Sequence, residues 1–137
     1  MKTTTQFLLA FIAVVSFTFT GCKKDKNEPD NIVGRWQFVK SEYKETMNGE
    51  TTNETNNAPE GSFLEFKADG SFIGKTEDMI SGRWVLNNGR LHLDGGGMLE
   101  SNANGYEIKK LTKSELVLYG KDVDGSFSSE ETVYLKK

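Results

Sequence analysis

The sequence predicts an all-β fold, an eight-stranded antiparallel up-and-down barrel, on three observations. From residue 32 onward apolar side chains recur with a period of two, and no segment carries an apolar helical stripe over two turns. Asp69-Gly70, Asn88-Gly89 and Asp124-Gly125 each separate two alternating runs, which is the strongest short-range signal of a hairpin. Eight such strands leave two edges exposed unless the first pairs with the last. A sandwich is the alternative architecture, and the absence of a long crossover favours the barrel.

Each strand follows from one alternating run. The first opens at "GRWQF", and "SFLEFKADGSFIGKT" gives the next two around its Asp-Gly turn. "SGRWVLNNGRLHLDG" gives the fourth and fifth, and "YEIKKLTKSELVLYG" gives the sixth and seventh around Thr112-Lys113-Ser114. "SSEETVYLKK" supplies the last. The expected strands are 32–45, 61–67, 70–77, 80–87, 90–94, 104–111, 114–121 and 129–136.

Two connections are longer than a hairpin requires. Residues 46–61 are polar and rich in Thr and Asn, and residues 94–105 contain three successive glycines. Long loops in a compact domain either serve function or carry no structure. For 46–61 both readings stay open, and for 94–105 the glycines favour plain flexibility.

The first 21 residues have the organisation of an export signal. Lys2 precedes an uncharged apolar run from Phe7 to Phe19. That run is shorter than the roughly 20 residues that a membrane-spanning helix needs. It fits the apolar region of a secretory signal peptide, which has about 7–15 residues. Residues 1–21 are therefore expected to be a signal peptide that is removed.

The stretch Phe19-Thr20-Gly21-Cys22 resembles the lipobox of bacterial lipoproteins, in which the cysteine is acylated, with palmitate among its acyl chains, and becomes the first residue of the mature chain. The resemblance implies lipidation of Cys22, the only cysteine, and anchoring by more than one acyl chain. Residues 22–31 then read as the lipidated cysteine and a charged, solvated tether. Lys24-Asp25 resembles part of a surface-export signal. We therefore expect an outer-membrane lipoprotein of a Gram-negative envelope, facing the periplasm or the cell surface.

The composition of the mature chain limits its partners. The whole chain has 17 basic and 20 acidic residues, and removal of Lys2 with the signal leaves 16 and 20, a net charge of −4. An acidic chain without a basic cluster argues against nucleic acid and against electrostatic attraction to anionic lipid. Residues 32–137 are long enough for one domain, which we expect to be monomeric.

The motif Gly34-Arg35-Trp36 at the start of the first strand resembles the Gly-x-Trp signature of lipocalins, and "LTKSELVLY" with its hairpin spacing is similar to the lipocalin-like domains of small Gram-negative envelope lipoproteins. The resemblance covers residues 32–137 and implies a lipocalin-like β-barrel closed at one end by Trp36. In lipocalins an arginine near the last strand packs across that tryptophan, and here either Lys136 or no residue is expected to take its place. Residues 46–61 occupy the position of the lipocalin entrance loop.

Alternation assigns an inward face that could line a hydrophobic ligand pocket. The candidate lining residues are Trp36, Phe38, Leu64, Phe66, Phe72, Trp84, Leu86, Leu93, Tyr106, Ile108, Leu116 and Leu118, with Leu91, Val133 and Leu135 on the same face. Such large side chains can equally fill a barrel of this size and leave no cavity. Gly74 and Gly82, inward by register, remove side-chain volume and favour a shallow cavity.

The remaining polar motifs give no strong signal of metal binding or catalysis. Asp122, Asp124 and Glu131 partly match a calcium loop, yet its first ligand position falls on Gly120, and a hairpin turn explains the same residues. His92 is the only histidine and lies on the outward face, without metal partners or an orienting acid. Glu130 and Glu131 point to opposite faces of a strand. We therefore expect no enzyme, metal or cofactor.

Two functional hypotheses remain. In the first, the protein is a non-catalytic binding module that holds a small apolar or amphipathic molecule inside the barrel. In the second, the barrel core is filled, and loops 46–61 and 94–105 contact an envelope protein or a glycan, as an inhibitor built on a small barrel would. A cavity above about 300 Å³ favours the first, and a solid interior favours the second.

Overall fold

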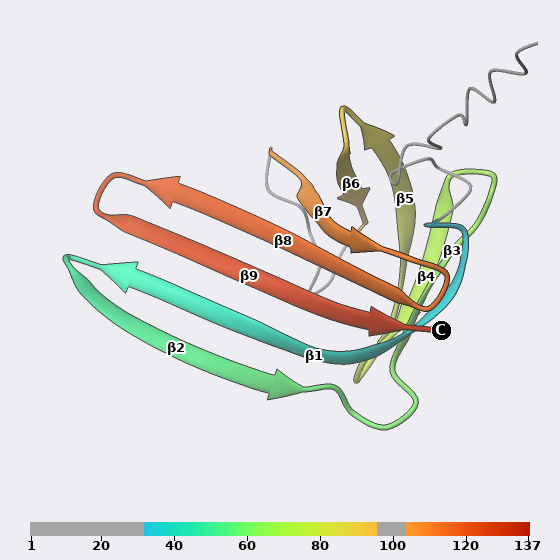
Figure 1. The fold of residues 1–137 in the computed structure, drawn as a ribbon, viewed down its shortest axis with the longest axis horizontal. Helices are drawn as coiled ribbons and strands as arrows, with labels where there is room; N and C mark the ends of the chain where they lie inside the picture. Colours follow the sequence, from blue (N-terminus) through green and yellow to red (C-terminus); the bar gives the residue numbers. More distant parts are fainter. Residues whose placement is uncertain (1–31, 96–103) are drawn as a thin grey trace, which may run out of the picture.

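A computed structural model describes residues 32–95 and 104–137, which form nine antiparallel strands (Figure 1). They are β1 (Gly34–Met47), β2 (Glu50–Asn57), β3 (Phe63–Phe66), β4 (Ser71–Lys75), β5 (Met79–Asn87), β6 (Arg90–Asp94), β7 (Tyr106–Leu111), β8 (Glu115–Asp124) and β9 (Phe127–Lys136). The expected signal peptide, Cys22, the tether and most of the connection 94–105 lie outside the described residues. Within those residues no helix has the length and apolarity that crossing a membrane requires.

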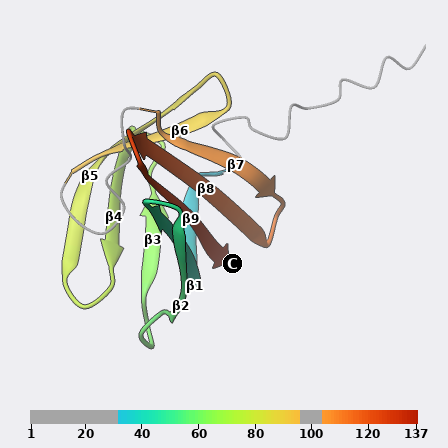
Figure 2. The same ribbon diagram turned by 90° about the vertical axis from the view of Figure 1, so that its left-hand side faces the viewer.

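Eight of the strands close into the predicted barrel. Consecutive strands from β3 to β9 pair in order, and β1 pairs with β3 on one side and with β9 on the other. The view in Figure 2 shows β3 to β7 curling round behind β8, β9 and β1. The weakest junction is β6–β7, where only Arg90–Glu107 and Leu91–Tyr106 are paired. The fold class expected from the sequence is therefore confirmed.

The ninth strand, β2, corrects the prediction that residues 46–61 form a loop. Residues 50–57 pair with β1 from Lys40–Asn57 to Met47–Glu50. Asn48 and Gly49 form the turn between the strands, with φ values of 51° and 86°. Positive φ at both positions is the mark of a type I′ hairpin. The sequence contains this Asn-Gly turn signal. All eight residues of β2 are exposed, so the strand needs no apolar side chain and leaves no alternating apolar pattern in the sequence.

The long strands extend beyond the barrel as a four-stranded arm, in the order β2–β1–β9–β8 (Figure 1). We define the arm as residues 41–57 of the β1–β2 hairpin and residues 120–131 of the β8–β9 hairpin. The register places Ser41 opposite Val133, which is buried in the barrel core. The face of the arm that carries Ser41 is therefore continuous with the barrel interior. We call it the inner face, and the opposite one the outer face.

The barrel interior is one packed apolar core, and both tryptophans belong to it as predicted. Trp36 is fully buried on β1 and Trp84 is buried on β5, the fourth strand of the barrel. Their indole nitrogens donate to the carbonyl oxygens of Ile32 and Lys67, at 2.7 and 2.9 Å. A buried indole N–H needs such a partner. The predicted inward face is buried throughout, except that Leu86 is half-buried.

Gly74 and Gly82 do not open a cavity. A Cβ atom built on Gly74 would lie 2.7 Å from the Leu64 side chain, and one on Gly82 would lie 2.1 Å from the carbonyl oxygen of Asp94. Neighbouring atoms already occupy the volume that the two glycines release. The sequence-based expectation that they favour a shallow cavity is therefore wrong, since they allow close packing instead.

Lys137, and not Lys136, takes the place of the lipocalin arginine. The Lys137 Nζ lies 4.3 Å from the centre of the Trp36 ring and donates to the carbonyl oxygen of Val33 at 3.1 Å. Lys136 is exposed, and in the sheet register it lies opposite Glu115 of β8 and Gln37 of β1. Gly34 has a φ of 120°, and its missing side chain leaves room for Lys137. The glycine of the Gly-x-Trp motif thus brings the cation and the indole ring together.

Candidate binding surface

The residues predicted to line a ligand pocket are packed against one another in the barrel. Trp36, Leu64, Phe66, Phe72, Leu116 and Leu118 are among the largest fully buried side chains. Phe38, Trp84, Leu93, Tyr106 and Ile108 are buried in the same cluster, and half-buried Leu86 packs against it. The rings of Phe66 and Trp84 meet edge to face, with centroids 5.8 Å apart. The structure therefore brings all the candidate lining residues together, as a core.

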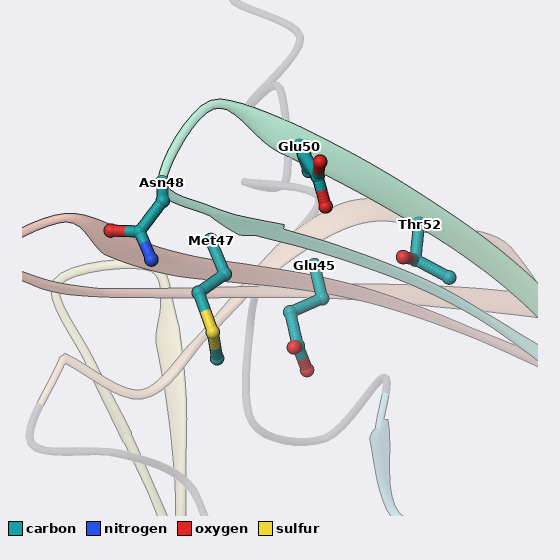
Figure 3. Close-up of a pocket in the computed structure, with 5 residues that line it drawn as sticks. All are labelled: Glu45, Met47, Asn48, Glu50 and Thr52. Carbon is teal, nitrogen blue, oxygen red and sulfur yellow. The ribbon is translucent and has the colours of Figure 1, made fainter.

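Two hollows formed by described residues lie on the arm. One has a volume of about 430 Å³ and is lined by Glu45, Met47, Asn48, Glu50 and Thr52 (Figure 3). All five side chains point to the same side of the β1–β2 hairpin. The second, of about 290 Å³, includes residues of the outer face such as Glu42, Lys44, Asn53, Thr55 and Glu130. Neither hollow is lined by a core residue of the barrel.

Every charged side chain that the described strands place on the inner face of the arm is acidic. Alternation along the paired strands assigns this face as follows: Glu45 on β1, Glu50 and Glu54 on β2, Asp122 and Asp124 on β8, and Glu131 on β9. Glu50, Glu54, Asp122 and Asp124 are exposed. The inner face therefore carries a concentrated negative charge.

The outer face carries both signs of charge in close pairs. Lys40 Nζ lies 2.6 Å from Glu42 Oε1, and Lys121 Nζ lies 3.1 Å from Glu130 Oε1. The hydrogen bond from Lys40, reinforced by one from Tyr134, lowers the pKa of Glu42, and the Lys121 hydrogen bond lowers the pKa of Glu130. Exposed pairs of this kind add little stability. Their opposite charges largely cancel on the outer face, whereas the inner face carries only acidic charges.

Glu131 joins the inner face to the barrel. The Tyr106 hydroxyl donates to Glu131 Oε2 at 3.0 Å. Burial raises the pKa of Glu131, and the Tyr106 hydrogen bond only partly opposes this effect. Burial, with the adjacent carboxylate, also raises the pKa of Tyr106 above its usual range. Glu130 points to the other face, as the sequence predicted.

The structure gives the calcium-like motif no converging ligands. Among residues 32–95 and 104–137, no three His, Cys, Asp or Glu side chains are close enough to hold a metal ion. Asp122 and Asp124 are exposed on β8, and Asp122 accepts a hydrogen bond from the backbone nitrogen of Val123. His92 packs beside Gly105, where an added Cβ atom would lie 2.8 Å from its ring.

Sequence reasoning proposed 46–61 as a contact surface but interpreted it as a loop, and so it missed the strand β2 and the acidic inner face of the arm. Two signals could have revealed them. Asn48-Gly49 is a hairpin turn, and its flanks are rich in Thr, which favours strands. Counting in steps of two from that turn would then have placed Glu45, Glu50 and Glu54 on one face.

Comparison with known proteins identifies the family. The chain matches the model of the lipocalin-like domain over residues 32–118, more than half of its 137 residues. The chain therefore belongs to the lipocalin-like domain family, whose barrel suggests a binding module. The match ends within β8, and the structure adds the strand β9 that closes the barrel. No curated protein and no solved structure matches the chain.

Proposed function

We propose that this protein is a lipid-anchored, non-catalytic binding module of the Gram-negative outer membrane, and that it meets a macromolecular partner through the arm. The observation that carries the proposal is the contrast between the two parts of the molecule. The barrel interior is filled by its own side chains, whereas the arm has two hollows and an acidic inner face. A packed interior leaves the arm as the surface with recognition features.

The position of the anchor supports this role. The lipobox-like sequence ends at Cys22, and the nine residues 23–31 can span at most about 30 Å before the barrel begins. β1 then runs from Gly34 in the barrel to Met47 at the tip of the arm, so the described chain enters at the end opposite to that tip (Figure 1). A barrel tethered in this way presents the arm away from the membrane.

The alternative is a small apolar or amphipathic ligand inside the barrel, as lipocalin-like proteins suggest. Such a ligand would have to displace side chains of the core, among them Trp36 and Phe66, which are 0% and 1% exposed. A native mass spectrum of protein purified from its own cells distinguishes the two readings. A co-purifying small molecule that is lost on mutation of the core would support the ligand reading and contradict ours.

Photo-crosslinking in intact cells tests the proposal directly. A photoreactive amino acid replaces Thr52 on the inner face of the arm, or Glu77 on the exposed β4–β5 turn as the matched control. We expect a defined crosslinked product from position 52 and none from position 77. Equal products from both positions, or a product from position 77 alone, would mean that the arm is not the binding surface.

A further inference from the structure

The outer edge of β2 is an open sheet edge. β2 pairs with β1 on one side, and no described strand pairs with the other. All eight residues of β2 are exposed. Proteins commonly block such an edge with charged side chains, proline or a bulge. "ETTNETNN" contains no lysine or proline, its register with β1 is uninterrupted, and its charged residues are Glu50 and Glu54. β2 therefore offers a template for one more strand that does not repel these two carboxylates.

The hairpin geometry shows which backbone groups face that edge. In a two-residue turn the flanking pair, here Met47 and Glu50, is hydrogen-bonded, and such pairs then alternate along the ladder. The bond from the Ala58 nitrogen to the Val39 oxygen, at 3.0 Å, fits the same alternation. The N–H and C=O groups of Thr51, Asn53, Thr55 and Asn57 consequently point away from β1. They are spaced for an incoming strand.

The charges beside this edge select the incoming strand. Glu50 and Glu54 lie along the edge on the inner face, and Glu45 lies opposite Thr52 in the next row. A second copy of this chain, pairing β2 with β2 in a continuous sheet, would bring these carboxylates together on one face. Like charges on neighbouring strands are destabilising. A strand with Lys or Arg at alternate positions would instead place its cations beside them.

We propose that β2 accepts an extended segment of a partner protein as an additional antiparallel strand, with basic side chains at every second residue facing Glu50 and Glu54. The proposal rests on the function proposed above and specifies the kind of partner that the arm binds, an extended segment with alternating basic residues. Backbone hydrogen bonds to Thr51, Asn53, Thr55 and Asn57 supply the binding, and the alternate side chains supply the selectivity. The remaining side chains of the segment lie on the outer face, beside Thr and Asn.

Synthetic peptides test the pairing with the protein purified from its own cells. A labelled peptide Thr-Lys repeated four times is compared with a peptide of the same composition in which the four lysines are consecutive. Fluorescence anisotropy should show the alternating peptide binding at least about tenfold more tightly. Equal affinity of the two peptides would reduce the interaction to unspecific charge attraction and overturn the proposal.

N-methylation of the peptide separates backbone pairing from charge while leaving the protein unchanged. In the proposed arrangement the threonine N–H groups point to β2 and the lysine N–H groups point away. Methylation of the threonine nitrogens should abolish binding, whereas methylation of the lysine nitrogens should preserve it. The opposite pattern would place the lysines on the outer face, away from Glu50 and Glu54, and no difference would show that no strand is added; either result overturns the proposal.

Variants of the protein locate the site. N53P removes an N–H group that faces the free edge, a position where a sheet tolerates proline, and N53A keeps it. N53P should lose binding and N53A should retain it, with far-UV circular dichroism confirming that both are folded. E50Q/E54Q should lower the affinity for the alternating peptide about tenfold, and the control E77Q should leave it unchanged. If position 52 crosslinks in cells but the peptides do not bind, the strand-addition proposal fails and the proposed function stands.

Discussion

At the scale of single residues, the best-defined position is Trp36. The indole is fully buried, donates to Ile32, and is covered by the Lys137 ammonium group. We predict that Trp36→Ala lowers the free energy of unfolding by about 3–5 kcal/mol, as deletion of a core aromatic usually does. Val85→Ala, at a residue 58% exposed on β5, should change it by less than about 0.5 kcal/mol. Denaturant unfolding of the two variants checks both values, and similar values would place Trp36 outside the core.

Glu130 and Glu131 are neighbours with opposite effects on stability. Burial raises the pKa of Glu131 above its ordinary value of 4.5, so the unfolded chain loses this proton first as the pH rises. The contribution of Glu131 to stability is therefore complete below the unfolded pKa and is lost as the pH rises through the folded pKa. Glu131→Gln should then stabilise the protein at pH 7 and have little effect near pH 3.

Glu130→Gln is the matched control. The Lys121 hydrogen bond lowers the pKa of Glu130, so its contribution is present above the unfolded pKa and is lost as the pH falls. Its substitution should destabilise the protein slightly at pH 7. Thermal unfolding of both variants across pH 3 to 8 measures the difference. A Glu131→Gln variant that is less stable than the wild type at pH 7 would show that the Tyr106 hydrogen bond outweighs burial.

At the scale of elements, the arm can be shortened without touching the core. β2 carries the chain back from Met47 to Phe63, and Phe63 pairs with Gln37, about 33 Å back along β1. Deleting β2 alone would therefore pull β3 out of the barrel. Removal of the paired segments 44–47 and 50–53 avoids this problem, because Tyr43 and Glu54 face each other and can be joined by Asn48-Gly49.

We predict that this shortened variant folds, because none of the removed residues belongs to the core. Its loss in unfolding free energy should be small beside that of Trp36→Ala, while the binding of the alternating peptide should disappear. Circular dichroism, denaturant unfolding and peptide binding are the measurements. A shortened protein that binds its partner as before would exclude the tip of the arm from the site.

The elements also show which parts of the fold a sequence reveals. The eight barrel strands were predictable because each buries one face, which leaves an alternating apolar pattern. β2 leaves none, because it buries no side chain. Bulges at Val39 and Lys109 shift the alternation, so buried Ser41 and Leu111 were missed. Whether the inward residues enclose a cavity depends on packing distances that no periodicity encodes.

At the scale of the whole molecule, the proposed membrane anchoring depends on one residue. If Cys22 is acylated as its lipobox-like context implies, Cys22→Ser should produce a protein that is soluble or retains its signal peptide. Membrane fractionation and intact mass spectrometry measure this, with Trp36→Phe as a control variant that keeps the anchor. If Cys22→Ser is fully retained in the membrane and the wild type carries no acyl mass, the prediction that the protein is a lipoprotein is wrong.

The pairing of β1 with β9 sets the order of events in folding. These strands are the first and last of the barrel, and ten residue pairs join them. Contacts between the two ends of a domain require closure of nearly the whole chain, and topologies dominated by such contacts fold slowly, in about milliseconds to seconds. The hairpins from β3 to β8 can form before the C-terminal residues are free to fold, but the barrel cannot close until β9 pairs with β1. If the chain is exported from its N-terminus, as we propose, it would reach its final shape only after its last residues had crossed the membrane.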